Sequence, residues 1–385
     1  MHKASKIVFV MPWHISERGG GAEVQANYLA KELLRRGYHV SYICQTNHAN
    51  KINSVENLDG VSIHWLKPSG KIQWLDQNKY LKPLKLIDPN YVIQRLTSNV
   101  SYVISKYSSK TKAKYIWICT DNKNPFRNYH LGKFKEHWTI GKIGVIKYSI
   151  FYLSNVIMDY YRNIGMKGID IAFTQNEFQK TRLKENFGRD SFRMISGHPA
   201  PSHRISNTDR FNNKTILWCA NFGRHKRPEM FIKLAKMLKT QNYKLIMVGG
   251  HSDKNYVASL LANKVQDLEV TGTLSFDDAL AYFDQASIFV NTSTPGGDGF
   301  PNTFIQAWLR QIPVVSLGFD PDNIIQKNNL GYVAKDIEDA KEFITQILSN
   351  YEMYKSTSLS AFEYSEKNHT IERMTDNFIQ SINSN

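Results

Sequence analysis

The stretch NTSTPGGDGFPNTFIQAW, residues 291–308, separates an apolar strand from an amphipathic helix. The run ASIFV before it (286–290) has the length and apolar character of a buried strand. Three glycines and two prolines surround a single carboxylate, that of Asp298. A strand, a permissive loop and a helix start in this order predict a parallel sheet with a ligand site at its carboxyl edge.

This loop has the chemistry to hold an anion that carries hydroxyl groups. Gly299 allows close approach of the backbone, and Pro301 suits the first turn of a helix. The N–H groups of Asn302 and Thr303 then point at an anion. Asp298 would bind hydroxyls instead, because two anions repel. A diphosphate with a sugar attached fits both, whereas a plain strand–loop–helix connection is the alternative interpretation.

The sequence around this loop alternates strands and helices in the way that is typical of a doubly wound α/β domain. A further helical stretch is expected over residues 337–382. The expected strands are TILWCA (215–220), YKLIMVGG (243–250), LEVTG (268–272), SIFVNTS (287–293) and PVVSL (313–317), and the helices are 227–240, a segment from 254, 275–286 and 302–311.

The first half opens with the same pattern, which predicts a second parallel sheet. A strand at 6–10 is followed by a helix that ends at Gly37 and by a strand at 39–44. Later strands are expected at 61–66, 115–120 and 169–175, and residues 72–161 should contain several amphipathic helices.

The chain of 385 residues is long enough for two such domains. The polar stretch 196–213, which contains Pro and Gly and lacks periodicity, predicts the linker. We therefore expect domains at 1–200 and 201–365, with a cleft between them, and a C-terminal helix at 366–385 that crosses back to the first domain.

The charge is concentrated in the first half. Residues 1–200 hold 30 Lys and Arg against 14 Asp and Glu, while residues 201–385 hold 19 against 20. A basic field favours an anionic partner such as a membrane surface, a phosphorylated ligand or nucleic acid. The aromatic and apolar stretch 141–163 is compatible either with a membrane surface or with an ordinary core helix.

Targeting and cysteine patterns predict a cytoplasmic protein. The apolar run near the N-terminus is too short for a signal peptide, and no segment offers the ~20 apolar residues of a membrane span. Cys44, Cys119 and Cys219 are widely spaced within apolar runs, which indicates buried thiols in a reducing compartment and not a zinc site.

Two other loops carry possible ligand groups. ERGGGAEVQ (17–25) offers N–H groups at the start of the first helix, although it is not a dinucleotide fingerprint and a flexible loop is equally compatible. CANFGRHKRPEMF (219–231) places cations beside a helix start, where an anion would have to offset the dipole. Lys226 is the expected diphosphate clamp and Arg224 supports it; a solvated basic turn is the alternative.

These motifs together resemble the retaining glycosyltransferases of family 4, which have the GT-B fold of two Rossmann-like domains. The resemblance covers the second domain in order and spacing, together with the first strand–helix unit. The motifs are GGGAEVQ (19–25), KRPEMFIKLA (226–235), VGG (248–250), GTLSFDDALAYFDQASIFVNTS (272–293) and GFPNTFIQAWLRQIPVVSL (299–317).

The resemblance implies transfer of a sugar from a nucleotide diphosphate sugar, with retention and without a metal or other cofactor. The second domain would hold the donor. Lys226 would balance its diphosphate, Phe300, Asn302 and Thr303 would lie along it, and Gly20 and Gly21 would approach it from the first domain. The leaving phosphate is thought to accept the proton of the acceptor.

The sequence departs from the family pattern at two places. The usual two glutamates, eight positions apart, appear as Asp298 and Gln306, which can still bind a sugar hydroxyl and the ribose. The arginine that usually accompanies the lysine falls at Asn221, so Arg224 is expected to take its place.

The first domain would bind the acceptor. His130 and His14 are candidates for the histidine that the family often has near the reacting centre, although a lone histidine is more often structural. Asp121, at the end of a predicted strand, is a candidate acceptor ligand.

The resulting hypothesis is a glycosyltransferase of surface polysaccharide synthesis, acting on a saccharide or a lipid diphosphate-linked saccharide. A peripheral position on the cytoplasmic face of a membrane is compatible with it. The alternatives are a nucleotide-sugar epimerase of the same fold, a non-catalytic sugar-binding protein and, from charge alone, a nucleic-acid-binding protein. The last is disfavoured because no nucleic-acid-reading module is recognisable.

Overall fold

The computed structural model describes residues 5–70, 72–201, 205–262 and 264–384. Its chain divides into two compact units. The first unit comprises Met1–Ile195 and Met374–Asn385, and the second comprises Ser196–Arg373. The expected linker begins at this boundary, and its residues 202–204 lie outside the described residues. Residues 196–200, expected in the first domain, join the second because the His198 N–H donates to the His369 carbonyl at 2.9 Å.

The described part of the first unit contains an eight-stranded sheet in the order β3-β4-β2-β1-β5-β6-β7-β8. All neighbouring strands are parallel except β3 and β4. The strand order reverses between β1 and β5, as in a doubly wound fold. The strands are β1 Lys6–Val10, β2 His39–Gln45, β3 Val55–Leu58, β4 Val61–Leu66, β5 Tyr91–Arg95, β6 Lys114–Ile118, β7 Ile171–Thr174 and β8 Phe192–Arg193.

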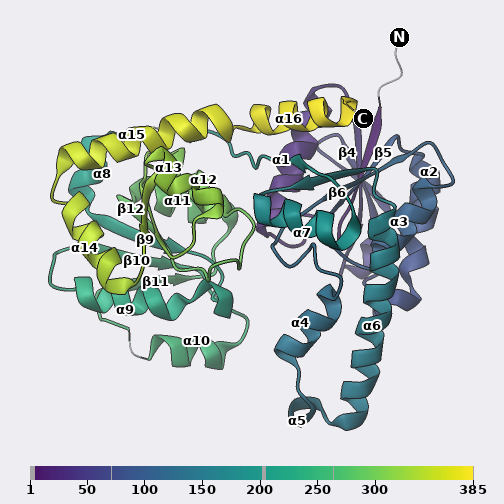
Figure 1. Cartoon of the computed structure of the whole chain (residues 1–385), viewed down its shortest axis with the longest axis horizontal. Coiled ribbons are helices and arrows are strands. Elements are labelled where there is room, and N and C mark those ends of the chain that lie inside the picture. Colours follow the sequence, from purple (N-terminus) through teal and green to yellow (C-terminus); the bar gives the residue numbers. More distant parts are fainter. Residues whose placement is uncertain (1–4, 71, 202–204, 263, 385) are drawn as a thin grey trace. The chain divides into compact units, whose positions relative to one another are not determined.

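Helices cover both faces of this sheet, and α1 lies on the face opposite α2 and α3 (Figure 1). One core joins the strands to α2, α3, α6 and α7. The helices are α1 Gly21–Arg35, α2 Leu81–Ile87, α3 Val100–Ser108, α4 Tyr129–His137, α5 Ile140–Ile143, α6 Val145–Lys167 and α7 Glu177–Phe187.

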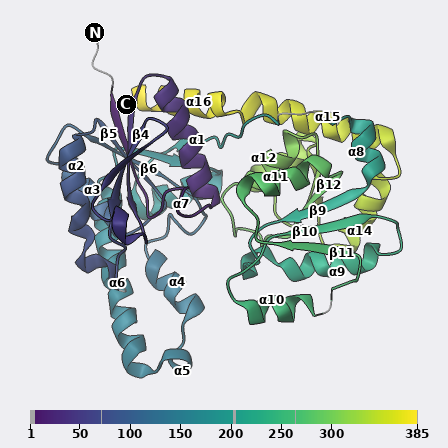
Figure 2. The same ribbon diagram turned by 180° about the vertical axis from the view of Figure 1, so that it is seen from behind.

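Helices α4, α5 and α6 form a hairpin that projects from the sheet of the first unit (Figures 1 and 2). Its base is packed tightly, because a Cβ at Gly165 on α6 would overlap the backbone of Ser101 on α3. The expected amphipathic helices of residues 72–161 are therefore present, and α6 continues to Lys167.

The described part of the second unit contains a six-stranded parallel sheet in the order β11-β10-β9-β12-β13-β14. Both units are thus doubly wound α/β domains, and the predicted fold class is confirmed. The strands are β9 Thr215–Cys219, β10 Lys244–Val248, β11 Leu268–Gly272, β12 Ile288–Asn291, β13 Val314–Leu317 and β14 Gly331–Ala334. The helices are α8 Asn207–Asn213, α9 Pro228–Leu238, α10 Lys254–Leu261, α11 Phe276–Gln285, α12 Asn302–Trp308, α13 Ile324–Asn328, α14 Ile337–Ile347 and α15 Tyr351–Asn368.

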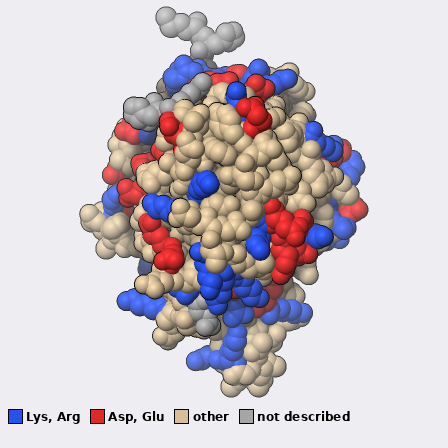
Figure 3. Space-filling model, turned by 90° about the vertical axis from the view of Figure 1, so that its left-hand side faces the viewer, with Lys and Arg blue, Asp and Glu red and all other residues tan. Residues whose placement is uncertain are grey.

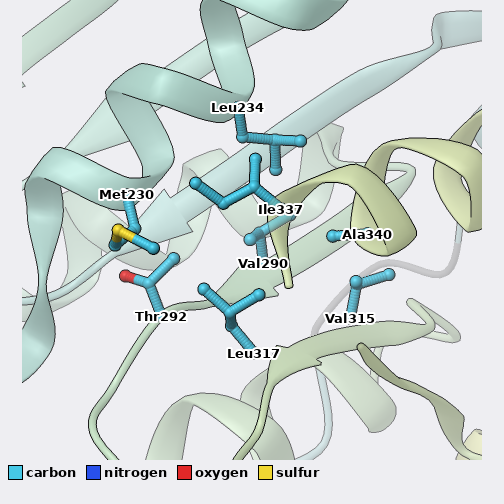
Figure 4. A pocket seen from close by; sticks show the side chains of 8 residues that line it. All are labelled: Met230, Leu234, Val290, Thr292, Val315, Leu317, Ile337 and Ala340. Atoms are coloured by element: carbon cyan, nitrogen blue, oxygen red, sulfur yellow. The ribbon is translucent and has the colours of Figure 1, made fainter. Parts of the chain in front are cut away.

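Alternate residues of the central strands face two separate cores in the second unit. Ile216 and Trp218 of β9 pack in the core that includes α9 and α14, while Leu217 packs in the core that includes α11 and α12. A cavity of about 10 Å³ remains in the first core, next to Leu234 and Ile337 (Figure 4). It has room for no more than one water molecule, so it is a packing gap and not a ligand site.

The predicted C-terminal helical stretch consists of α14, α15 and α16 (Ile371–Asn383). The chain returns to the first unit within α16, where Phe378 stacks on Phe173 of β7 with ring centres 5.3 Å apart. Arg36 and Asp376 form an ion pair at 2.5 Å in the same unit.

Charged side chains of both signs occur on the face shown in Figure 3, and neither sign covers it. None of the helices in the described ranges is long and apolar enough to cross a bilayer.

Candidate active site

The second sheet reverses its strand order between β9 and β12, and the loops that follow these two strands leave its carboxyl edge side by side. The loop after β9 covers residues 220–227 and the loop after β12 covers 292–301. The Thr294 N–H donates to the His225 carbonyl at 2.8 Å, so the two loops are hydrogen-bonded to each other. This is the position at which open α/β sheets bind their ligands.

The two loops bring Lys226 and Asp298 together. The Lys226 Nζ donates to the Asp298 Oδ2 at 2.6 Å, and both side chains are about one-fifth exposed, at 22% and 20%. Burial would raise the pKa of Asp298, but the charge of Lys226 and its hydrogen bond lower that pKa overall. The site therefore holds a partly accessible cation and an ionised carboxylate in direct contact.

Arg227 links the loop that carries Lys226 to the ends of β12 and β13 through hydrogen bonds. Its guanidinium donates to the carbonyls of Thr292 (2.6 Å) and Leu317 (2.8 Å), which follow β12 and end β13. The Thr292 hydroxyl in turn donates to the Lys226 carbonyl at 2.6 Å. Arg227 was not among the predicted site residues. It positions the loop that carries Lys226, although its left-handed backbone (φ 47°) is unusual for arginine.

The loop after β9 also depends on Gly249, which directly follows β10. A Cβ at this residue would overlap the Ala220 carbonyl, and φ is 141°. The adjoining Phe222 N–H donates to the Gly250 carbonyl at 3.0 Å. Asn221 and Arg224, both predicted to contact the donor, lie on this loop with exposed side chains.

The residues predicted to lie along the donor differ in accessibility. Gly299, Phe300 and Pro301 are buried, and the Phe300 ring stacks on His369 with centres 5.2 Å apart. Helix α12 begins at Asn302 and has only seven residues. Asn302 and Thr303 are half-buried, and the Asn302 side chain is hydrogen-bonded to His198. Gln306 is buried, so little of its side chain faces solvent.

In the first unit, Gly20 and Gly21 begin α1 as predicted. The side chain of Glu23 folds back toward Gly20, where a Cβ would lie 2.5 Å from the Glu23 Oε2. Burial raises the pKa of this carboxyl, and its own backbone N–H and Arg95 oppose the rise. A carboxylate of the chain thus already lies at this helix start.

Arg95, at the carboxyl end of β5, was missed from the sequence. It is 2% exposed, and its Nε and Nη1 atoms have no hydrogen-bond partner among the described residues. Burial lowers its pKa to about 10, and the charge of Glu23 opposes this. A lone arginine within a strand gives no motif, so only the fold could bring it to the start of α1.

Asp121 has a structural role in its own loop. Its Oδ1 accepts from the backbone N–H groups of Lys123 (2.8 Å) and Asn124 (2.9 Å). Burial lowers the pKa of His130 to about 3, and its Nε2 has no hydrogen-bond partner in the described chain. His14 is also buried, which lowers its pKa to about 4, and its Nδ1 lies 2.9 Å from the Ser16 hydroxyl. Both histidines are therefore neutral at pH 7.

Comparison with known proteins agrees with the geometry of the second unit. Residues 213–352 match the family model described as glycosyl transferases group 1. The matched segment contains both Lys226 and Asp298. The match covers most of the second unit, which therefore has the sequence pattern of the group 1 glycosyltransferases. No curated protein sequence matches the chain.

Solved structures with the same fold cover nearly the whole chain. Sucrose-phosphate synthase from Thermosynechococcus elongatus superposes with a TM-score of 0.73 at 12% identity, covering 99% of this chain and 98% of that one. HepE of Anabaena, in complex with UDP-glucose, superposes with a TM-score of 0.73 at 12% identity, covering 99% of this chain and 100% of that one. WaaG, a glycosyltransferase involved in lipopolysaccharide biosynthesis, superposes with a TM-score of 0.68 at 12% identity, covering 96% of this chain and 98% of that one. The fold is that of the GT-B glycosyltransferases.

Proposed function

We propose that the protein is a retaining glycosyltransferase that moves a sugar from a nucleoside diphosphate sugar to a saccharide or lipid-linked saccharide, without a metal ion. The observation that carries this proposal is the contact between Lys226 and Asp298 at the carboxyl edge of the second sheet. HepE binds UDP-glucose on the same fold, which supports a donor of this class.

The pair suits a donor that has a diphosphate next to a sugar. The Lys226 ammonium would exchange its bond to Asp298 for one to a diphosphate oxygen. The carboxylate, held ionised, would then accept a hydrogen bond from a sugar hydroxyl. As the bond to the sugar breaks, charge develops on the diphosphate, and a fixed cation stabilises it. The leaving oxygen would take the proton of the acceptor hydroxyl, so no histidine is required for this step.

The acceptor is proposed to bind the first unit, whose sequence is strongly basic. WaaG acts in lipopolysaccharide biosynthesis, which supports a cell-surface saccharide as product. One structure of this fold binds a DNA oligomer with a modified base, so DNA is an acceptor that must be tested separately.

The donor site is tested by calorimetric titration of nucleoside diphosphates into wild type, Lys226→Met and the control Lys233→Met. Lys233 is an exposed lysine on α9 of the same unit. Loss of one charge-assisted bond is expected to weaken binding about tenfold or more in Lys226→Met only. Equal affinities in all three proteins would contradict the proposed donor site.

Retention and metal independence need a second experiment. The anomeric configuration of the product, followed by NMR from the first turnovers, is expected to match that of the donor. A chelator is expected to leave the rate unchanged. Inversion, or a rate that only a divalent ion restores, would contradict these two parts of the proposal.

A further inference from the structure

Helix α6 is firmly anchored at its C-terminal half. The buried Arg162 donates to the carbonyls of Asn124 and Phe126, in the loop that follows β6. Asp159 accepts from the His130 N–H (2.8 Å) and the Leu131 N–H (3.0 Å), which begin α4. This half of the helix is a core element of the first unit, as one of the two sequence interpretations held.

The N-terminal half of the same helix exposes aliphatic side chains instead. Ile146, Ile150 and Leu153 are 77%, 51% and 59% exposed. Their spacing of four and three residues places them on one face of the helix. A soluble surface normally has polar residues at such positions, and a contiguous exposed apolar face indicates an interaction site.

The apolar surface continues around the turn of the hairpin. Trp138, in the connection after α4, is 46% exposed, and Ile140 of α5 is 50% exposed. Val145, at the start of α6, is also exposed. We call residues 131–153 the hairpin tip; it is the part that projects farthest from the sheet of the first unit (Figures 1 and 2).

The hairpin tip is also rich in lysine, and one of its lysines, Lys133, lies 3.9 Å from the Asp121 carboxylate. The hairpin tip contains four lysines and one acidic residue, Glu136. Glu136 is itself paired, at 2.7 Å, with Lys123 outside the tip. The lysines are Lys133, Lys135, Lys142 and Lys147.

We infer that the hairpin tip docks on an anionic lipid bilayer, with its aliphatic face among the acyl chains and its lysines at the headgroups. Aliphatic side chains beside Lys, Trp and Tyr are the composition of elements that lie in a membrane interface. An anionic bilayer complements both the apolar face and the positive charge. A second copy of the hairpin would complement only the apolar face, because the lysines of the two copies would repel each other. This inference goes beyond sugar transfer and does not depend on it.

Vesicle co-sedimentation of the full chain tests the inference. The probes are vesicles of phosphatidylcholine alone and of phosphatidylcholine mixed with phosphatidylglycerol. The variants are Ile146→Ser/Ile150→Ser/Leu153→Ser and the control Val55→Ser/Leu75→Ser/Leu86→Ser, whose residues are exposed elsewhere in the same unit. Lys142→Glu/Lys147→Glu tests the contribution of charge.

Wild type and the control are expected to bind the anionic vesicles, more weakly at high salt, and to bind the neutral vesicles poorly. The tip variant should lose at least about tenfold in affinity, and the lysine variant should lose its preference for anionic lipid. Thermal melts check that each variant is folded, and nucleotide binding should be unchanged in all of them.

Three results would overturn the inference. Wild type could fail to bind anionic vesicles, or the control could lose as much affinity as the tip variant. Alternatively, sedimentation velocity could show a wild-type dimer that the tip variant dissociates, without vesicle binding, which would assign the surface to a second copy. None of these results bears on the donor site, because nucleotide titration measures that separately.

Discussion

At the scale of single residues, the contact between Lys226 and Asp298 predicts competition between the carboxylate and a ligand anion. In Asp298→Asn the ammonium no longer has an anionic partner, so nucleoside diphosphates should bind about fivefold more tightly. Turnover of the sugar nucleotide should nevertheless fall, because a neutral amide is a weaker acceptor for a sugar hydroxyl. Calorimetric titration and initial rates measure the two effects.

The matched control is Asp284→Asn. Asp284 accepts from Arg310 at 2.7 Å elsewhere in the second unit, so its change also breaks an ion pair. Tighter diphosphate binding in this control as well would show that the effect has nothing to do with Lys226.

The buried His198 predicts how the second unit responds to acid. Burial, together with the charge of His369, lowers the pKa of His198 to about 3. The unfolded chain binds a proton near pH 6.5 and the folded chain does not, so stability is complete above pH 6.5 and decreases toward pH 3. As the pH falls from 6.5 to 5, this residue should lower the free energy of unfolding by about 2 kcal/mol.

Urea unfolding at the two pH values measures this effect. His198→Gln should reduce the loss by about the same amount, 2 kcal/mol, whatever its stability at pH 7. His251→Gln, at an exposed site of the same unit, is the control. If the pH dependence of His198→Gln matches that of wild type, the buried imidazole is not its source.

The residues of the site could be predicted only where a local motif marks them. Lys226 and Asp298 lie in glycine- or cation-rich loops, and both were predicted from the sequence; the structure brings their side chains within 2.6 Å of each other. Arg95 interacts with the charge of Glu23, and Arg227 donates to carbonyls after β12 and at the end of β13. These partners are far away in the chain, so no local pattern marks either arginine. Gln306 was predicted to bind the ribose hydroxyls of the donor, and the packing of α12 buries its side chain.

At the scale of elements, the close packing of α3 and α6 predicts the effect of one methyl group. Gly165→Ala would force the two helices apart, since the new Cβ would overlap the Ser101 backbone. The expected loss is about 1–3 kcal/mol of unfolding free energy for the first unit. Chemical denaturation followed by circular dichroism measures it.

Gly132→Ala is the matched control on α4. No atom lies within 4 Å of a Cβ built at Gly132, and the residue is helical. This change should stabilise the protein slightly, by about 0.5–1 kcal/mol. If both variants are equally stable, the helices are not held at the distance that the structure gives.

Periodicity in the sequence located most elements but not all of them. Strands β1 and β4 have the predicted bounds, because β1 is apolar from Ile7 onward and β4 alternates apolar residues with Ser62 and His64 before it ends in Trp65 and Leu66. Strand β5 was missed although it is central in its sheet. Its five residues end in Gln94 and Arg95 and lie in a lysine-rich region, so the apolar signal is too short. The exposed aliphatic face of α6 could not be told from a core face, since both have the same spacing.

At the scale of the whole molecule, the first unit depends on residues at the far end of the chain. Met374, Phe378 and Ile382 of α16 are buried. Removing Met374–Asn385 should cost the first unit about 5 kcal/mol or more, if each apolar side chain contributes ~1.5–3 kcal/mol. Scanning calorimetry should show a lower transition for this unit and an unchanged one for the second.

Nucleotide titration identifies the transition of the second unit, because a bound ligand raises the stability of the unit that holds it. In the truncated protein, nucleoside diphosphate should still raise this transition. Loss of both transitions together would show that the two units do not unfold independently.

The return of the chain to the first unit also has a consequence for biosynthesis. The ribosome makes residues 6–195 first, but the segment that completes their core, from Met374 onward, follows the entire second unit. Domains usually fold in order from the N-terminus as they emerge. Here the first unit can complete its core only after the second unit has been translated. Until then, Phe173 of β7 lacks the Phe378 ring that stacks on it in the complete fold. Chaperones that bind nascent chains should therefore contact the first unit for longer than its position in the sequence suggests.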